Sequence, residues 1–198
     1  MEEKRNFDLL TLGQVLLRLS PPNNDRLVRG DTFVKQVGGA ELNVAVGVAL
    51  LGLRTGVISK LPSHDMGSFM KGKIRSYGVS DDFFMYDDSP SARVGIYYYE
   101  NGAYPRKPKV IYDRANSSFY SLKIDEIPEK AYTASRCFHT SGITLALSPK
   151  VRETTIEMIK RFKAAGTLVS FDVNFRGNLW TGEEAKECIE QILPYVDI

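Results

Sequence analysis

With 198 residues, the chain is long enough to bury one sizeable hydrophobic core. Its 26 basic and 24 acidic residues leave a net charge of +2, which argues against a nucleic-acid-binding surface or an acidic tail. The longest apolar run, residues 44–53, is too short to cross a bilayer, and two cysteines with two histidines are too few for a metal site. We therefore expect a cytoplasmic protein with reduced thiols and with neither a nucleic-acid nor a membrane partner.

Short apolar runs predict buried strands at residues 7–12, 55–61, 135–141 and 167–173. The charged residues 1–5 lead directly into the first strand and do not have the pattern of a signal peptide. Helical stripes follow at 39–51, around 151–162 and after Thr181, where Glu184 completes a capping box. Another follows Asp65, which we expect to cap that helix. Strands alternating with helices indicate a parallel sheet with right-handed crossovers.

Three further segments have the alternation of exposed strands. Residues 15–19 continue extended from the first strand, and residues 26–37 suit an exposed strand pair that turns at Gly30. Residues 91–99 place Val94 and Ile96 on one face and Tyr97 on the other, and after a turn at 101–102 the chain returns through 109–114. Together they predict an antiparallel flap beside the parallel core.

Gly38 and Gly39 directly precede an apolar helix, which places free backbone N–H groups and the positive end of a helix dipole at a potential pocket. Asn43 is the residue of that helix most suited to contact a ligand. The alternative is a plain turn before a buried helix, with Asn43 as a helix cap.

Polar residues also follow the last predicted strand. Asp172, Asn174 and Arg176 stand at its carboxyl end, where open parallel sheets bind ligands. We expect Asp172 to fix the loop rather than to bind metal, and His139 to be a structural histidine.

Several of these motifs together resemble the ribokinase-like (PfkB) sugar kinases. The resemblance is carried by Gly-Gly-Ala-Glu-Leu-Asn at 38–43, Asp-Met-Gly at 65–67 and Asp-Val-Asn-Phe-Arg at 172–176. Within that family the chain is most similar to 2-keto-3-deoxygluconate kinases, through Arg-Leu-Ser-Pro-Pro at 18–22 and His-Thr-Ser-Gly-Ile-Thr at 139–144. The lid residues Tyr97, Tyr112 and Arg114 add to this closer match.

The resemblance implies a Rossmann-like, ribokinase-type α/β fold: a parallel sheet flanked by helices, with a small antiparallel β lid that mediates a homodimer. Residues 1–198 would form a single truncated domain, with lid strands at about 14–37 and 91–114 and with the C-terminal part of the fold missing. It also implies phosphoryl transfer from ATP, with Mg²⁺, to a sugar hydroxyl.

The resemblance also implies roles for individual residues. Gly38, Gly39 and Asn43 would hold substrate hydroxyls, and Ile143 would line the pocket. Tyr97, Tyr112 and Arg114 would reach the substrate from the lid. Asn174 and Arg176 would lie near the phosphates, and Arg176 would also bind the acid group.

Arginine side chains suit a sugar acid because the planar guanidinium matches a carboxylate. Arg114 and Arg176 are the main candidates, and Arg18 is a lesser one. The alternatives are solvated surface arginines and, for Tyr97 and Tyr112, cross-strand packing within the lid.

Two departures from the family pattern matter. Many of these kinases have Gly-Glu after the first strand, whereas this chain has Gly13-Gln14. The Asn-x-x-Glu motif and the Gly-Ala-Gly-Asp motif, which supplies the general base, are absent and would lie beyond residue 198. We therefore expect no catalytic residue within this chain and no kinase activity from it alone.

Two other hypotheses remain open. The chain could derive from a fructokinase- or nucleoside-kinase-like enzyme, although convergent arginines argue against a nucleoside. It could also be a non-catalytic sugar-binding or dimerisation module with an exposed apolar face.

Overall fold

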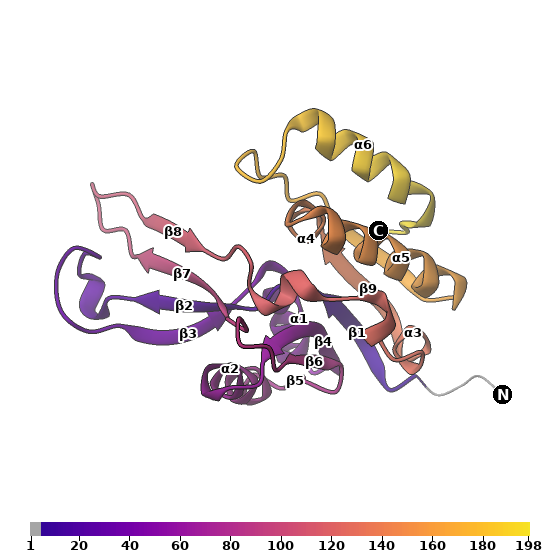
Figure 1. The fold of residues 1–198 in the computed structure, drawn as a ribbon, viewed down its shortest axis with the longest axis horizontal. Coiled ribbons are helices and arrows are strands. Elements are labelled where there is room, and N and C mark those ends of the chain that lie inside the picture. The colour runs from indigo at the N-terminus through magenta and orange to yellow at the C-terminus, as the bar shows by residue number, and fades with distance from the viewer. Residues whose placement is uncertain (1–4) are drawn as a thin grey trace.

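A large sheet with helices on both faces and a smaller sheet projecting from it make up the computed structural model (Figure 1). The structure describes residues 5–198, so the expectation for residues 1–4 lies outside the described residues.

The large sheet has six strands in the order β10-β9-β1-β4-β5, and β6 also pairs with β4. All of its pairings are parallel. Every residue of β4 is buried, as expected of a parallel strand covered on both faces. The four strands predicted for this sheet are therefore confirmed, and the strands are β1 Phe7–Leu12, β4 Thr55–Pro62, β5 Val79–Ser80, β6 Phe84–Asp87, β9 Ser135–Ser141 and β10 Leu168–Asp172.

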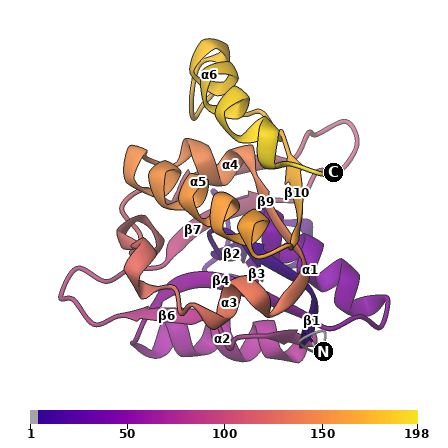
Figure 2. The same ribbon diagram turned by 90° about the vertical axis from the view of Figure 1, so that its right-hand side faces the viewer.

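Helices cover the two faces of this sheet (Figure 2). Val57 and Ile58, adjacent in β4, belong to different hydrophobic clusters and so mark the two faces. The first cluster joins the sheet to α3, α4, α5 and α6, and Phe162 of α5 stacks on Phe138 at 4.1 Å between ring centroids. The second joins it to α1 and α2. The helices are α1 Ala40–Leu50, α2 Asp65–Ser76, α3 Lys130–Thr133, α4 Gly142–Ala146, α5 Pro149–Ala164 and α6 Gly182–Ile192, with 3₁₀ turns at Pro22–Asn24, Ser118–Ser121, Ile124–Glu126 and Leu193–Tyr195.

Two predicted helix caps have different outcomes. The capping box of α6 is confirmed, since Thr181 and Glu184 each accept a hydrogen bond from the other's backbone N–H. The predicted cap of α2 is wrong, because Asp65 is already helical and the side chain of His64 accepts from the N–H of Met66 at 3.2 Å. Asp65 instead places a negative charge in the first turn, which also favours the helix.

The smaller sheet, here called the lid, has four strands in the order β3-β2-β7-β8. Its strands are β2 Leu16–Ser20, β3 Val34–Gly38, β7 Gly95–Glu100 and β8 Lys109–Asp113. The β2–β3 and β7–β8 pairs are antiparallel, but β2 and β7 are parallel. The expected antiparallel lid is therefore a mixed sheet, because β2 and β7 both leave the same edge of the large sheet, after β1 and β6.

The strand pair expected within residues 26–37 is also wrong. Only Val34–Gly38 is a strand, and its partner is β2 rather than residues 26–30. After Glu100 the chain reverses through a loop that holds an isolated bridge between Ala103 and Arg106, so the return is longer than a two-residue turn.

The two faces of the lid differ in chemistry, as the alternation in β7 predicts. Leu17 and Ile96, which are paired between β2 and β7, pack on the hydrophobic cluster of α1 and α2. The next pair, Arg18 and Tyr97, projects from the opposite face, and Tyr112 of β8 lies beside Tyr97. One face of the lid therefore anchors it to the core and the other carries polar side chains.

The C-terminal residues lie along the outer edge of β10. The N–H of Asp197 donates to the carbonyl of Val169 at 2.8 Å, and the N–H of Phe171 donates to the carbonyl of Ile198 at 2.9 Å. These backbone hydrogen bonds continue the hydrogen bonding of the large sheet beyond β10.

Within residues 5–198 no helix is long and apolar enough to cross a membrane. Both thiols are free, and burial raises the pKa of Cys137 and of Cys188. Cys188 belongs to the first hydrophobic cluster, whereas Cys137 is half-buried.

Candidate functional site

The predicted site residues stand at the carboxyl edge of the large sheet, beneath the polar face of the lid. β1, β9 and β10 end there at Leu12, Ser141 and Asp172. Of the lid strands, β2 and β7 begin at the same edge, and β3 and β8 return to it. Ligands of open parallel sheets bind at this edge.

The two glycines that precede α1 allow three chain segments to meet. A Cβ on Gly38 would lie 2.6 Å from the hydroxyl oxygen of Tyr97, and a Cβ on Gly39 would lie 2.7 Å from the backbone carbonyl oxygen of Gln14. Gly39 also has a φ of 154°, which other residues rarely adopt. The glycines therefore bring the start of α1 against the lid and against the end of β1.

Asn43 lies in the first turn of α1 and is exposed. Its proposed alternative role as a helix cap is excluded, because Gly39 holds the cap position and α1 has no side-chain cap. Its backbone N–H donates to the carbonyl of Gly39 at 2.9 Å, so Asn43 lies one helical turn after the glycine pair.

Glu41 is a buried carboxylate that the sequence analysis did not single out. It is 1% exposed, and its Oε1 accepts hydrogen bonds from Ser141 Oγ at 2.6 Å and from Thr144 Oγ1 at 2.7 Å. The residue thus ties the start of α1 to the start of α4, which carries Ile143. The available signal was its place two residues after Gly39, near the start of a mostly apolar helix.

The lid contributes an aromatic pair beside a guanidinium. Tyr97 and Tyr112 are paired across β7 and β8, with ring centroids 6.0 Å apart. The Arg114 guanidinium carbon lies 5.6 Å from the centroid of the Tyr112 ring. Burial raises the pKa of Tyr97, and the nearby Arg18 guanidinium opposes that rise. Tyr97 is therefore a neutral hydroxyl at neutral pH, able to donate and to accept hydrogen bonds.

Arg114 is held by a buried residue outside the expected set. Its Nε donates to Gln14 Oε1 at 2.8 Å, and Gln14 is only 3% exposed. Burial lowers the pKa of Arg114, and the charge of Glu41 is among the influences that oppose this change. Gln14 was noted only as a departure from the family pattern, and no local sequence signal links it to a residue so far along the chain.

The loop after β10 is less tightly organised. Asp172 accepts a hydrogen bond from the N–H of Asn174 at 3.0 Å, so it fixes the loop as expected. Arg176 is exposed, and its hydrogen bond to a described residue is a long one, 3.5 Å, to the carbonyl of Phe175. The structure thus brings Tyr97 and Tyr112 together with Gly38 and with Arg114, whereas among the described residues Arg176 forms neither a hydrogen bond nor an ion pair with this group.

Two further predicted residues lie in β9 and in the helix that follows it. His139 is 7% exposed, its Nδ1 lies 3.0 Å from Ser170 Oγ, and burial lowers its pKa, which agrees with the expected structural role. Ile143 is half-buried in α4, where Ser141 Oγ accepts from its N–H at 3.3 Å.

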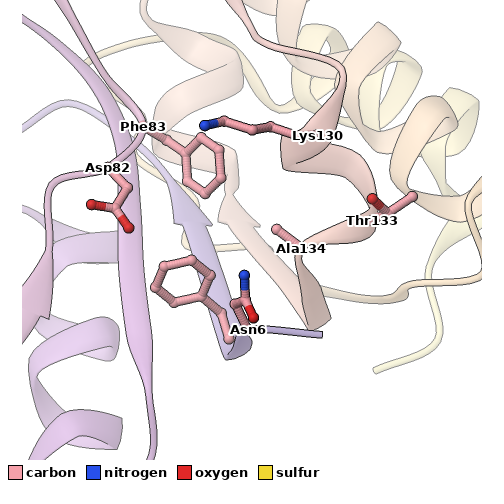
Figure 3. A pocket seen from close by; sticks show the side chains of 7 residues that line it. Asn6, Asp82, Phe83, Lys130, Thr133 and Ala134 are labelled. Carbon is pink, nitrogen blue, oxygen red and sulfur yellow. The ribbon is translucent and has the colours of Figure 1, made fainter. Parts of the chain in front are cut away.

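A different pocket, of about 440 Å³, lies at the opposite edge of the large sheet (Figure 3). Phe7, the first residue of β1, and Ala134, just before β9, both line it. It is therefore remote from the polar face of the lid. No group of three or more potential metal ligands is found in the part of the chain that the structure describes.

Comparison with known proteins decides the family. Residues 6–198 match the family described as pfkB family carbohydrate kinase. This chain is a member of the pfkB family of carbohydrate kinases.

Individual members of the pfkB family resemble the chain over most of its length. It is 38% identical over 191 residues to a 2-dehydro-3-deoxygalactonokinase of Haloferax volcanii, covering 96% of this chain and 59% of that protein. The crystal structure of 2-dehydro-3-deoxygluconokinase from Thermotoga maritima superposes with a TM-score of 0.91 at 38% identity, covering 96% of this chain and 58% of that one.

A fructokinase from Xylella fastidiosa with bound ATP superposes with a TM-score of 0.79 at 26% identity, covering 96% of this chain and 56% of that one. The pfkB chain described here therefore spans somewhat more than half the length of these relatives.

Proposed function

We propose that this chain is the N-terminal, acceptor-binding portion of an ATP-dependent kinase that phosphorylates a sugar acid such as 2-keto-3-deoxygluconate. The observation that carries the proposal is Arg114. Its guanidinium lies 5.6 Å from the ring centroid of Tyr112 and is held by Gln14, whose carbonyl oxygen borders Gly39. It forms no ion pair with any described residue.

A partly buried guanidinium without a carboxylate partner favours an anionic ligand. Bringing a carboxylate to it makes charge-assisted, often bidentate hydrogen bonds that repay the cost of desolvating the cation. A neutral sugar offers no such compensation. The names of the Haloferax and Thermotoga relatives, both kinases of 2-dehydro-3-deoxy sugar acids, support the same substrate class.

The remaining roles follow from position around Arg114. Tyr97 and Tyr112 would contact the acid end from the lid, and Gly38, Gly39 and Asn43 would hold hydroxyls. Ile143 would close the apolar side, and Asn174 and Arg176 would lie toward the phosphates. ATP, with Mg²⁺, would supply the transferred phosphoryl group, and the ATP-bound fructokinase relative supports the choice of nucleotide.

We also propose that the lid forms a homodimer interface. Phe33 and Ile111 are 45% and 44% exposed, and Phe33 packs edge-on against Tyr98 at 6.0 Å. Tyr98 and Ile111 are paired in β7 and β8, one residue from Tyr97 and Tyr112, so they lie on the face that carries Leu17 and Ile96. The part of this face around Phe33 and Ile111 stays exposed, whereas Leu17 and Ile96 pack on the core. An exposed apolar cluster of this kind is a common site of association.

Calorimetric titration of the chain with 2-keto-3-deoxygluconate, fructose and adenosine tests the substrate class. We expect the acid to bind more tightly than the other two, and Arg114→Ala to weaken its binding at least about tenfold, the equivalent of about 1.4 kcal/mol. Arg26→Ala, an exposed arginine of the lid loop, serves as the matched control and should change nothing.

Two results would contradict this assignment. Tighter binding of fructose than of the acid would favour a fructokinase-like parent. Acid binding that is unaffected by Arg114→Ala would remove the observation on which the proposal rests.

A further inference from the structure

The pocket at the edge of the large sheet opposite the lid has no part in the proposed function (Figure 3). Its volume of about 440 Å³ lies within the range of about 300–1,000 Å³ that small-molecule sites occupy. Three separate segments form its walls: the start of β1, the residues before β6, and α3 with the residue that follows it. The chemistry of the side chains on these walls indicates what kind of molecule the pocket can hold.

The floor of this pocket is aromatic and is held by the core. Phe7 and Phe83 are 9% and 5% exposed, and their rings meet edge to face with centroids 5.9 Å apart. Both belong to the first hydrophobic cluster. The N–H of Phe7 donates to the carbonyl of Ala134 at 2.9 Å, which ties the start of β1 to the wall that carries Lys130 and Thr133. The walls are therefore fixed relative to one another without a ligand.

Two charged side chains of opposite sign, Asp82 and Lys130, also line the pocket. Figure 3 shows Asp82 on one side of the hollow and Lys130 on the other, with Phe83 between them. Neither of the two charged residues forms an ion pair with another described residue. An acceptor and a donor of full charge thus face the same aromatic floor from opposite sides.

The sequence neighbours of these two charged residues do form ion pairs. An oxygen of Asp81 lies 3.2 Å from Nζ of Lys71, and an oxygen of Glu129 lies 3.2 Å from a guanidinium nitrogen of Arg161. The charges beside the pocket are therefore used within the protein, whereas the two charges that line it are available to a ligand.

We propose that this pocket binds a free α-amino acid with an aromatic or large apolar side chain. Asp82 would accept from the ammonium group, Lys130 would bind the carboxylate, and the ligand side chain would lie on Phe83. A zwitterion makes a charge-assisted contact at both ends, whereas a simple anion or cation leaves one protein charge without a partner. Asn6 and Thr133, which also line the pocket, can add neutral hydrogen bonds.

This site goes beyond the proposed function and does not depend on it. The pocket lies where β1 begins, whereas Arg114 is held by Gln14, just beyond the end of β1. The amino acid would therefore be a second ligand of the chain and not the acceptor of a phosphoryl group.

Calorimetric titration with three related probes tests the requirement for a zwitterion. L-phenylalanine carries both charges, 3-phenylpropanoate lacks the ammonium group, and phenethylamine lacks the carboxylate. We expect L-phenylalanine to bind at least about tenfold more tightly than either of the others, because it alone makes both charge-assisted contacts. Equal binding of all three probes, or no binding of L-phenylalanine with a Kd below about 10 mM, would overturn the proposal.

Single substitutions assign the two ends of the ligand. In Asp82→Asn, L-phenylalanine should bind no more tightly than 3-phenylpropanoate, and in Lys130→Gln no more tightly than phenethylamine. Both positions are exposed, so we expect the variants to fold. Asp31→Asn and Lys107→Gln make the same changes at exposed positions of the lid and should bind L-phenylalanine as wild type does. A preference for L-phenylalanine that survives in both pocket variants contradicts the assignment.

NMR spectra of the chain locate the amino acid directly. Addition of L-phenylalanine should shift the backbone amide signals of Phe83, Thr133 and Ala134 and should leave those of Gly38 and Gly39 unchanged. The reverse pattern would place the amino acid beside the lid and would overturn the proposal.

Discussion

At the scale of single residues, the site depends on positions where a side chain is absent. Gly38, Gly39 and Gly95 lie within van der Waals contact of Tyr97, Gln14 and Leu16, so the three segments that carry the candidate ligand contacts can approach one another. Gly39 is the least replaceable of these, because it combines a φ of 154° with a backbone oxygen in the place of a Cβ.

Two glycine-to-alanine substitutions near each other should therefore have opposite effects. Gly39→Ala should lower the free energy of unfolding by about 1–3 kcal/mol, since neither the backbone conformation nor the Gln14 carbonyl can accommodate a methyl group. Gly47→Ala, within α1 and with no atom within 4 Å of the added carbon, should raise it by about 0.5–1 kcal/mol. Urea denaturation of both variants measures the difference, and a Gly39→Ala variant as stable as wild type would contradict this account.

At the scale of secondary-structure elements, hydrogen bonds between buried polar groups connect helices whose contact the hydrophobic pattern of the sequence does not predict. Glu41 of α1 accepts hydrogen bonds from the hydroxyls of Ser141 and Thr144 at the start of α4. Gly13 leaves the room for this carboxylate, because a Cβ there would lie 2.1 Å from Glu41 Oε2. The position of Ile143 between the two hydroxyls thus depends on a residue in another helix.

Removing that carboxylate should loosen the start of α4. Glu41→Ala should lower the free energy of unfolding by about 3 kcal/mol, because two buried hydroxyls lose their acceptor and a cavity remains. Glu41→Gln keeps an acceptor oxygen and should lose about 1 kcal/mol. Thermal or urea unfolding provides the measurement, with the exposed Glu153→Ala of α5 as the control. Similar losses in Glu41→Ala and Glu153→Ala would show that the link contributes little.

The sequence predicts elements well where burial is continuous and less well where partners are distant. β4 and α5 were located because an apolar run and a helical stripe report burial directly. The lid itself is predicted, but the parallel pairing of β2 with β7 is not, because the contact of Leu16 with Gly95 joins segments whose relative direction neither sequence determines. The contact of Gln14 with Arg114 could not be predicted for the same reason, since it requires the lid to be in place. The proposed ligand roles of the lid tyrosines remain predictions.

At the scale of the whole molecule, the candidate site is assembled from one edge of the sheet and the lid above it. The chain spans 59% of the Haloferax relative, and we propose that the general base and the nucleotide-binding segment belong to the part of the relatives that the chain does not cover. Phosphoryl transfer depends on positioning and charge neutralisation by such groups.

We therefore expect no kinase turnover from this chain alone. In a coupled assay with ATP, Mg²⁺ and 2-keto-3-deoxygluconate, the rate should stay at background, with the full Thermotoga maritima relative as the positive control. Turnover of about 1 s⁻¹ or more, which is ordinary for kinases, would show that the chain holds a complete catalytic apparatus.

The parallel pairing of β2 with β7 also constrains the order in which the molecule can form. During synthesis β2 emerges early and finds β3 on one side, but its other edge has no partner until the strands and helices up to β7 have been made. Parallel pairing between distant segments is entropically slow, and an unpaired edge is open to association with other chains meanwhile. The lid, with the exposed β8 as its last strand, is thus completed only after the core strands β1, β4 and β6 exist to orient it.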